Sequence, residues 1–456
     1  MFNNVQKKSR FSKKEKSEQL LDLFKIGVFS VQPKNILDSF LKVNKKQIII
    51  KKSISQKKVY SNIEKIFPIC IGKASVDMAK KVKEIFKTSD LKIEKGVVIV
   101  NKENFKKIPG FKCFSSNHPV PDKYGFEAAN YLRNYLSNLN ANDLVLVFIS
   151  GGGSALAPLP VDQISLKDKV LVNKILLECG ANIKEINAVR KHLSKIKGGN
   201  LCKICFPAFI QSFILSDVIG DDLSSIASGM TTYDESTFND VHNILKKYKV
   251  WKRVPIKVQN FIKLGVRDKN LETPKKNDLI FKKTNNVLIG SNNLCLESIQ
   301  NFCKSSKISS KIWMRNIEGD VKKVTKDLAS KIKNLKIKRP IILISGGETT
   351  VKVVGNGKGG RNQEFGLYFC KQMKVQNPNQ KFYILSAGTD GRDGPTDSAG
   401  TILNHLSLSD ISEKKINLAK ELKNNNSYEV LKKIKSLVII KGTNTNVADV
   451  QLIYLS

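Results

Sequence analysis

The stretch DLVLVFISGGGSAL, residues 143–156, contains six consecutive apolar residues, then Ser150, three glycines and the start of a helical pattern. Six apolar residues in a row are typical of a strand that is buried on both faces of a sheet. The run is far shorter than the roughly 20 residues of a membrane-spanning helix. Glycines directly after such a strand favour a tight turn. The stretch therefore predicts one strand–turn–helix unit of an α/β fold.

The same pattern recurs along the chain. Apolar runs that end in glycine or a small polar residue begin near residues 66, 96 and 209, and again near 285, 341 and 382. Such strands alternating with helical patterns predict parallel sheets with helices on both faces. The similarity of ISGGGSAL (149–156) to ISGGETTV (344–351) predicts comparable glycine loops in two halves of the chain. Ligands of open α/β sheets bind beyond the carboxyl ends of the strands, where these loops are expected.

The length of 456 residues is typical of two or three domains. The first residues lack the apolar core of a secretion signal, so we expect a basic extension without fixed structure. Weak periodicity around Pro255 and Pro274 indicates a domain boundary. The predicted division is an extension over 1–19, an N-terminal α/β domain over 20–251, a linker region over 252–285 and a C-terminal α/β domain over 286–456.

The chain carries a formal net charge of +38, with 78 Lys and Arg against 40 Asp and Glu. Nucleic-acid-binding proteins usually cluster their basic residues on one face and use arginine for paired contacts. Here only nine of the basic residues are arginine, and the lysines are spread along nearly the whole chain. The charge therefore predicts a solvated lysine surface that attracts anionic substrates, with no specific nucleic-acid partner and no membrane.

The eight cysteines lack the spacing of a disulfide framework or a zinc site. The single CxxC, Cys202 to Cys205, is either a redox pair or two apolar residues of the core. Free thiols in a chain of this size predict a cytoplasmic protein.

The three glycines 151–153 and Ser154 are open to two interpretations. Glycine lets backbone N–H groups approach an anion closely, and the start of a helix adds partial positive charge, so the loop suits a phosphate. A tight strand-to-helix turn explains the same residues without a ligand.

Two further strand ends carry polar residues. Lys73 in IGKAS lies between a buried strand and a helix, next to a glycine. His118 in SSNHPVPD lies between Asn117 and Pro119 and is one of four histidines. We interpret Lys73 as functional, whereas His118 suits a ligand contact and a structural hydrogen bond equally well.

Acidic residues also follow strands. Asp217 ends the apolar run FILSD, and the loop SAGTDGRDGPTDSAG (386–400) places Asp390 and Asp393 around Arg392. Carboxylates beyond strand ends suit Mg²⁺, which binds one or two carboxylates together with phosphate oxygens. These residues are therefore candidates for a metal and substrate site.

The segment VVGNGKGGRNQEF (353–365) contains the string GxGxxG. A dinucleotide site also needs an acid about 20 residues later at the next strand end, and Asp390 comes late for that role. The glycines alternatively free the backbone so that Lys358 and Arg361 reach an anion. Glycine loops, isolated cations and Asp residues together are typical of phosphoryl transfer.

Taken in order, the motifs resemble those of the glycerate 2-kinases with a C-terminal MOFRL domain. The resemblance covers essentially the whole chain, from about Leu20 to Asp449, and its specificity comes from the number and order of the motifs. They are IGKAS, SNHPVPD, ISGGGSAL, LSDVIGDD, ASGMT, ISGGETTV, GKGGRNQEF and SAGTDGRDGPTDSAG.

The resemblance implies two α/β domains, the first Rossmann-like, with the active site in the cleft between them. It implies phosphorylation of D-glycerate to 2-phosphoglycerate with ATP and Mg²⁺, by a monomer or homodimer. Lys73 and Arg361 match the family residues proposed for catalysis. Members have also carried the label hydroxypyruvate reductase, so an NAD(P)-dependent reductase is the alternative.

From the resemblance and the residues together we expect a role for each candidate. The catalytic residues are Lys73, Arg361, Asp217 and Asp390. The nucleotide is bound by Gly151, Gly152, Gly153, Ser154, Gly346, Gly347 and Glu348, the substrate by Asn117, His118 and Arg392, and Mg²⁺ by Asp390 and Asp393.

Overall fold

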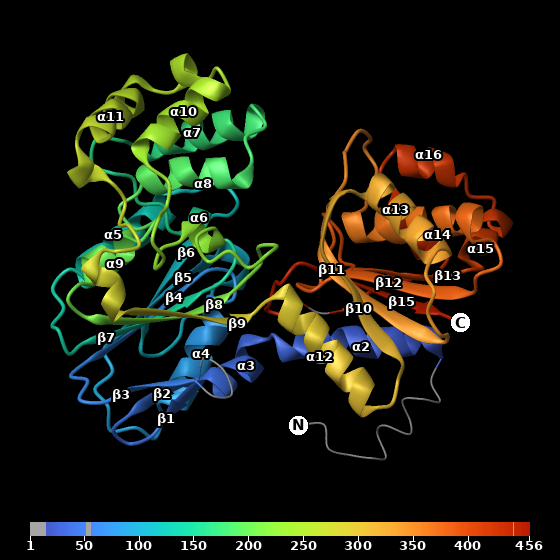
Figure 1. Cartoon of the computed structure of the whole chain (residues 1–456), viewed down its shortest axis with the longest axis horizontal. Helices are drawn as coiled ribbons and strands as arrows, with labels where there is room; N and C mark the ends of the chain where they lie inside the picture. The colour runs from blue at the N-terminus through green and yellow to red at the C-terminus, as the bar shows by residue number, and fades with distance from the viewer. Residues whose placement is uncertain (1–14, 52–55, 441) are drawn as a thin grey trace. The chain divides into compact units, whose positions relative to one another are not determined.

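The computed structural model describes residues 15–51, 56–440 and 442–456 (Figure 1). The chain divides into two compact units. The parallel-sheet unit spans Pro33–Ile289. The mixed-sheet unit combines Gly290–Ser456 with the described residues up to Gln32.

The parallel-sheet unit is built on six strands in the order β6-β5-β4-β7-β8-β9. The four pairings from β6 to β8 are all parallel, as predicted. This is the strand order of doubly wound nucleotide-binding folds, in which the order reverses between the first and fourth strands, here β4 and β7. The strands are β4 (Ile66–Ile71), β5 (Gly96–Asn101), β6 (Phe111–Ser116), β7 (Leu144–Ile149), β8 (Phe209–Leu215) and β9 (Thr284–Gly290).

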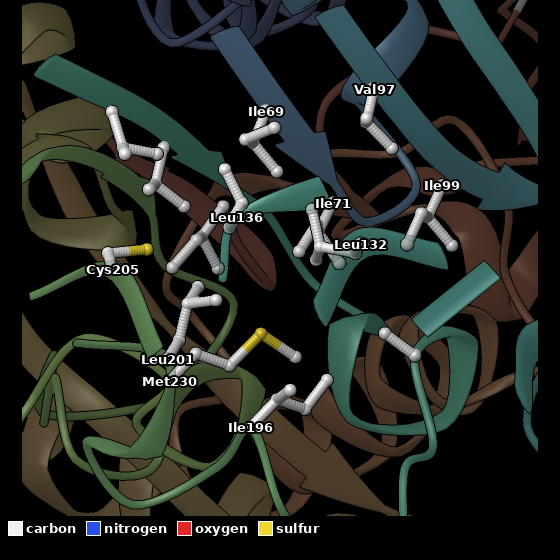
Figure 2. Close-up of a cluster of buried hydrophobic side chains, with 14 of the residues drawn as sticks. Ile69, Ile71, Val97, Ile99, Leu132, Leu136, Ile196, Leu201, Cys205 and Met230 are labelled. Atoms are coloured by element: carbon white, nitrogen blue, oxygen red, sulfur yellow. The ribbon is translucent and has the colours of Figure 1, made fainter. Parts of the chain in front are cut away.

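The core of this unit lies against the sheet. Every residue of β4, β5 and β7 is buried, as the continuous apolar runs predict for a sheet covered on both faces. On one face, Ile69, Ile71 and Val97 pack with Leu132 of helix α5 (Lys123–Tyr135) and with Leu136 directly after it (Figure 2).

Helices and a small antiparallel sheet complete the unit. The small sheet is β1 (Leu41–Val43), β2 (Ile48–Lys51) and β3 (Lys57–Tyr60). The α-helices are α3 (Pro33–Phe40), α4 (Ser75–Ile85), α5 (Lys123–Tyr135), α6 (Gly153–Leu156), α7 (Leu166–Glu178), α8 (Ile183–His192), α9 (Asn200–Cys205), α10 (Phe238–Lys247) and α11 (Ile256–Arg267). The 3₁₀ helices are η1 (Lys102–Asn104), η2 (Ile226–Ser228), η3 (Trp251–Arg253), η4 (Lys269–Leu271) and η5 (Leu279–Lys283).

The structure differs from the prediction at residues 252–285, which we expected to be a linker. They form η3, α11, η4 and η5 and belong to the parallel-sheet unit. Val258 and Ile262 of α11 are fully buried, and the ring of Phe261 lies edge-on to Phe238 of α10 at 5.5 Å. Of the prolines that suggested a boundary, Pro255 directly precedes α11 and Pro274 lies in the loop between η4 and η5, so neither interrupts a helix.

The mixed-sheet unit also has six strands, in the order β10-β11-β15-β12-β13-β14. Only β10 and β11 pair in parallel, which corrects the prediction of a parallel sheet in this half. The last strand of the chain inserts antiparallel between β11 and β12, and apolar runs do not reveal strand direction. The strands are β10 (Ser310–Asp320), β11 (Ile341–Thr350), β12 (Phe382–Gly388), β13 (Gly400–Asn404), β14 (Leu437–Val438) and β15 (Asp449–Leu455).

Helix α2 (Lys16–Ser30), the first in the described residues, packs in this unit beside α12 (Asn292–Ser305) (Figure 1). A Cβ at Gly27 would lie 2.7 Å from Ile299 Cδ1, so the missing side chain lets the two helices approach closely. The helix begins at Lys16, earlier than the predicted start near Leu20, and the rest of the predicted extension, residues 1–14, lies outside the described residues. The helices are α2 (Lys16–Ser30), α12 (Asn292–Ser305), α13 (Val321–Lys333), α14 (Arg361–Gln376), α15 (Ser407–Glu413), α16 (Leu418–Lys423) and α17 (Ser427–Lys433).

Two further observations concern membrane-spanning helices and the cysteines. In the part of the chain that is described, no helix has the length and apolar character needed to cross a membrane. Cys202 and Cys205 are buried and unbonded, in agreement with a role in the core.

Candidate active site

The loops after β4 and β7 are joined by hydrogen bonds where the strand order reverses. Lys73 N donates to the carbonyl oxygen of Gly151 at 3.0 Å, and Ala74 N donates to Ser150 Oγ at 3.0 Å. Gly72 has φ +125°, and a Cβ there would lie 2.2 Å from Ser150 Oγ, so only glycine fits. These contacts place Lys73 beside the glycine turn.

Three predicted residues surround the turn at Gly151 and Gly152. A Cβ on Gly151 would lie 2.0 Å from Asp217 Oδ2. A Cβ on Gly152, whose φ is +85°, would lie 3.1 Å from His118 Cδ2 and 3.4 Å from Lys73 Cε. The structure therefore brings Lys73, His118 and Asp217, which are far apart in the sequence, to one glycine turn.

The electrostatics of this group favour an anionic ligand. Burial, reinforced by the charge of Lys73, lowers the pKa of His118 to about 4, so this side chain is neutral at neutral pH. Burial raises the pKa of Asp217, while its own backbone N–H and the charge of Lys73 act in the opposite direction. Among the described residues, no carboxylate forms an ion pair with Lys73 within 4 Å, so its charge is available to a ligand.

Substitution of Gly151 tests this packing directly. We expect Gly151→Ala to lower kcat/KM by roughly 100-fold, since a shift of about 1 Å in a positioned group has effects of that size. The cause is the collision of the new Cβ with Asp217 Oδ2 at 2.0 Å. Steady-state kinetics measure the loss, and Gly442→Ala is the control because a Cβ there meets nothing within 4 Å. Equal activity of the two variants would contradict the placement of Asp217.

The neutral state of His118 predicts a specific dependence of stability on pH. Its folded pKa of about 4 lies below the ordinary 6.5, so the unfolded chain binds more protons between these values. The contribution of His118 to stability is therefore complete above pH 6.5 and is lost as the pH falls toward 4. We expect urea unfolding to show a smaller stability loss from pH 7.5 to pH 5 in His118→Gln than in the unsubstituted protein. Identical losses would contradict the shift.

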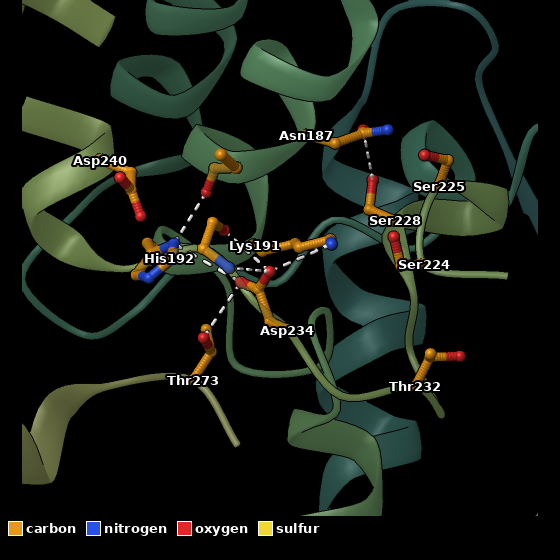
Figure 3. Close-up of polar contacts among 12 residues, drawn as sticks. Asn187, Lys191, His192, Ser224, Ser225, Ser228, Thr232, Asp234, Asp240 and Thr273 are labelled. Carbon is orange, nitrogen blue, oxygen red and sulfur yellow. Dashed lines mark hydrogen bonds and ion pairs between the residues drawn. The ribbon is translucent and has the colours of Figure 1, made fainter. Parts of the chain in front are cut away.

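A strained turn at residues 227–229 packs against the glycine loop. Ala227, Ser228 and Gly229 are consecutive residues with φ of 50°, 57° and 63°. Left-handed backbone costs about 1–3 kcal/mol at a non-glycine residue, so the surrounding contacts must enforce it. Ser228 Oγ donates to Asn187 Oδ1 at 3.1 Å and shares a hydrogen bond with Ser154 Oγ at 2.6 Å; Figure 3 shows the Ser228–Asn187 contact. The motif ASGMT is part of the resemblance, but Asn187 was missed.

Asn117 has a local role in the structure. Its Nδ2 donates to the carbonyl oxygen of Val120 at 3.1 Å, which stabilises the turn that carries His118. Its predicted substrate contact stays a prediction.

The mixed-sheet unit holds the second group of predicted residues around Arg361. Arg361 Nε and Nη2 donate to Asp449 Oδ2 and Oδ1 at 2.6 and 3.0 Å, and Nη1 lies 2.6 Å from Glu348 Oε1. Burial alone would lower the pKa of Arg361, but the hydrogen bonds that it donates to Asp449 raise this pKa, so the guanidinium stays charged. Asp449 was missed by sequence reasoning; the signal is an acid at the start of a mostly apolar strand.

The acidic loop after β12 is divided between two environments. Asp390 Oδ1 accepts the N–H of Arg392 at 2.9 Å, and the Arg392 side chain is exposed. Asp393 is buried, and its two oxygens accept N–H groups of Asn362 and Gln363 at 3.1 and 2.9 Å. Asp393 therefore holds the start of α14, a structural role that does not favour the predicted bond to Mg²⁺.

Gly346 and Gly347 do not form the predicted loop. They lie inside β11, where they pair with Val450 and Asp449 of β15. A Cβ on Gly347 would lie 2.2 Å from the backbone of Ile317 in β10, so close strand packing explains this glycine. The similarity of ISGGETTV to ISGGGSAL is therefore one of sequence, since only the second is a strand–turn–helix.

The GxGxxG glycines also have packing explanations. Added Cβ atoms would lie 2.4 Å from Asn424 at both Gly355 and Gly357, and 2.2 Å from Asp393 at Gly360. Within the described residues, no group of three or more His, Cys, Asp or Glu side chains is arranged to hold a metal ion.

Comparison with known proteins gives consistent results. The model of a domain of unknown function, DUF4147, matches residues 19–263, and the model of the MOFRL family matches residues 341–449. A glycerate 2-kinase of Pyrococcus horikoshii is 37% identical over 402 residues, which are 87% of this chain and 88% of that protein. A protein of Agrobacterium vitis, 33% identical over 391 residues (84% of this chain and 97% of that one), is provisionally named a hydroxypyruvate reductase.

A solved structure matches along nearly the whole chain. The crystal structure of a glycerate kinase from Thermotoga maritima superposes with a TM-score of 0.82 at 32% identity, and the match covers 96% of this chain and 99% of that one.

Proposed function

The chain belongs to the DUF4147/MOFRL family of glycerate 2-kinases, and from this premise we propose that it transfers the γ-phosphoryl group of ATP to the C2 hydroxyl of D-glycerate. The observation that carries the proposal is the convergence of Lys73, His118 and Asp217 on the turn at Gly151 and Gly152. The convergence lies at the reversal of strand order, where doubly wound sheets bind ligands.

Asp217 is the proposed base. It accepts the proton of the C2 hydroxyl while the new O–P bond forms and the bond from the γ-phosphorus to the ADP oxygen breaks. Its oxygen lies against Gly151 rather than in open solvent, and burial raises its pKa toward a useful range for proton transfer. Lys73, close to the same turn, stabilises the negative charge of the transferred group.

Arg361 is the proposed second cation of the reaction. Three of its five N–H groups are used by Asp449 and Glu348, so two remain for an anionic oxygen. The two carboxylates orient the guanidinium and leave one edge of it free, which suits a phosphoryl group.

ATP is implied by the kinase family, and Mg²⁺ is a further part of the proposal. The donors fit Mg²⁺ bound mainly by phosphate oxygens, since this ion takes one or two protein carboxylates. Asp390 is the candidate carboxylate. When bound, Mg²⁺ would neutralise phosphate charge. Arg392 and Glu348 are proposed to contact substrate and nucleotide, and Gly151, Gly153 and Ser154 to supply hydrogen-bond donors to phosphate.

The test is incubation of the purified protein with D-glycerate, ATP and Mg²⁺. We expect ADP and 2-phosphoglycerate, identified by NMR and by direct conversion with enolase in the absence of a mutase. Oxidation of NAD(P)H with hydroxypyruvate, without ATP turnover, would overturn the proposal. The packing of the GxGxxG glycines against Asn424 and Asp393 supports the kinase, because a dinucleotide is not needed to explain them.

A further inference from the structure

A cavity of about 190 Å³ lies beside the glycine turn within the parallel-sheet unit. Gly152, His118 and Ser154 form the side next to the turn, and helices α7 and α8 supply most of the rest. A Cβ on Gly152 would lie within 3.4 Å of both His118 and Lys73. Gly152 and His118 therefore separate the cavity from the proposed catalytic group and line both.

Three basic side chains line this cavity. Lys169 and Lys197 are 8% and 1% exposed, and their Nζ atoms donate to the carbonyl oxygens of Leu193 and Ala157 at 3.0 and 2.9 Å. Arg190 Nε donates to Asn173 Oδ1 at 2.7 Å.

No acid balances these charges in the described part of the chain. Among the described residues that line the cavity there is no Asp or Glu, and none of the three cations forms an ion pair within 4 Å. The terminal nitrogens of Arg190 likewise have no hydrogen-bond partner within the described ranges. Lys169, Arg190 and Lys197 thus each have N–H groups around the cavity that are available to donate to a ligand.

The other buried lysines show that this arrangement is unusual for the chain. Lys191 pairs with the buried Asp234 at 3.2 Å, a contact drawn in Figure 3. Lys81 lies 2.7 Å from Asp38 and 2.8 Å from Glu84. A buried charge is costly without a partner, and here the partner is missing for Lys169 and Lys197 alone among the described buried lysines.

The cost is reflected in the titration of these groups. Burial lowers the pKa of Lys197 to about 7, with a further contribution from Arg190. Burial, and then Lys197 and Arg190, hold the pKa of Lys169 well below its usual range. An anion in the cavity would supply the missing negative charge to all three.

We propose that Lys169, Arg190 and Lys197 form the binding site for the carboxylate of the small hydroxy-acid substrate. The inference rests on the proposed function and assigns residues that neither the motifs nor the family resemblance singled out. The planar guanidinium of Arg190 matches a carboxylate, and the two lysines add point charges. The carboxylate would lie among these three side chains, with the acid's hydroxyl directed toward the shared side of the cavity at Gly152 and His118.

The size of the cavity selects the acid over the nucleotide. Pockets for drug-sized ligands and cofactors measure roughly 300–1,000 Å³. A cavity of about 190 Å³ suits a three-carbon acid, whereas a nucleoside triphosphate is too large.

The experiment combines Lys197→Met, Lys169→Met and Arg190→Lys with the control Lys81→Met, a buried lysine that has acidic partners. We expect the methionine variants to raise KM for D-glycerate on the order of 10- to 100-fold, the value of a charge-assisted hydrogen bond, with KM for ATP unchanged. Arg190→Lys should raise it less. The control Lys81→Met should leave KM for D-glycerate and KM for ATP unchanged.

Thermal unfolding without nucleotide separates this inference from the proposed function. We expect D-glycerate to raise the Tm of the unsubstituted protein, and Lys197→Met to have a higher Tm without ligand but to lose that shift. This readout needs no kinase activity, so absent turnover with an intact shift would refute only the proposed function. A rise in KM for ATP instead, a Tm shift with inorganic phosphate but not with D-glycerate, or unchanged variants would each overturn the carboxylate site.

Discussion

We expect Lys73→Met to lower kcat/KM for D-glycerate phosphorylation on the order of 10³-fold while the fold stays intact. A single cation or donor that stabilises developing charge at a transferred group has effects of this size. The backbone N–H of Lys73 donates a hydrogen bond to the carbonyl oxygen of Gly151 at 3.0 Å. Because this bond involves only the backbone, we expect it to survive the substitution of the side chain. Steady-state kinetics with glycerate and ATP measure the loss.

The matched control is Lys80→Met on α4. Lys80 is mostly exposed and lies 3.7 Å from Asp77, so the same chemical change should leave kcat/KM within about twofold, as expected for a surface ion pair. If Lys73→Met and Lys80→Met were equally active, Lys73 would have no part in the reaction. If Lys73→Met lost its cooperative unfolding transition, its role would be structural.

The second large effect is expected at Arg361, where substitution lowers the stability of the fold as well as the activity. We expect Arg361→Met to lower the free energy of unfolding by about 3 kcal/mol, because it leaves a buried carboxylate without its partner. Asp449 is fully buried and accepts two hydrogen bonds from Arg361. This loss is at the lower end of the range of about 3–5 kcal/mol for breaking a buried ion pair. The Arg361 side chain is 34% exposed, so water screens part of the interaction. Urea unfolding measures it.

A double substitution separates this loss from catalysis. Arg361→Met with Asp449→Asn removes both charges, so we expect it to regain more than half of the lost stability. We also expect it to remain about 10³-fold less active than the unsubstituted protein, because the proposed phosphoryl contact is still absent. Recovery of activity together with stability would show that Arg361 only supports the fold.

Much of the parallel-sheet unit could be predicted from the sequence, because its signals are local. Continuous apolar runs such as residues 144–149 identify buried strands, and glycines after them identify tight turns. Parallel strands present their carboxyl ends at one edge, so Lys73 and Asp217, each just after a strand, could be named as candidates before their contacts were known. These conclusions need only the pattern of neighbouring residues.

The role of a glycine, by contrast, was decided by what packs against it. Gly152 and Gly347 both follow the string Ile-Ser-Gly, yet the first lies in a turn beside His118 and the second lies in a strand against Ile317. The direction and neighbours of β15 depend on pairing with strands more than sixty residues away, and apolar patterns carry no such information.

The sequence by itself therefore determined the α/β class, most strands of the first unit and the glycine turn with Lys73. The tertiary structure decided the antiparallel insertion of β15, the pair of Arg361 with Asp449 and the cavity with Lys169 and Lys197. The physical reason is that burial and pairing create the special properties of these charges. In a chain so rich in lysine, nothing local distinguishes a solvated lysine from one enclosed without an acid.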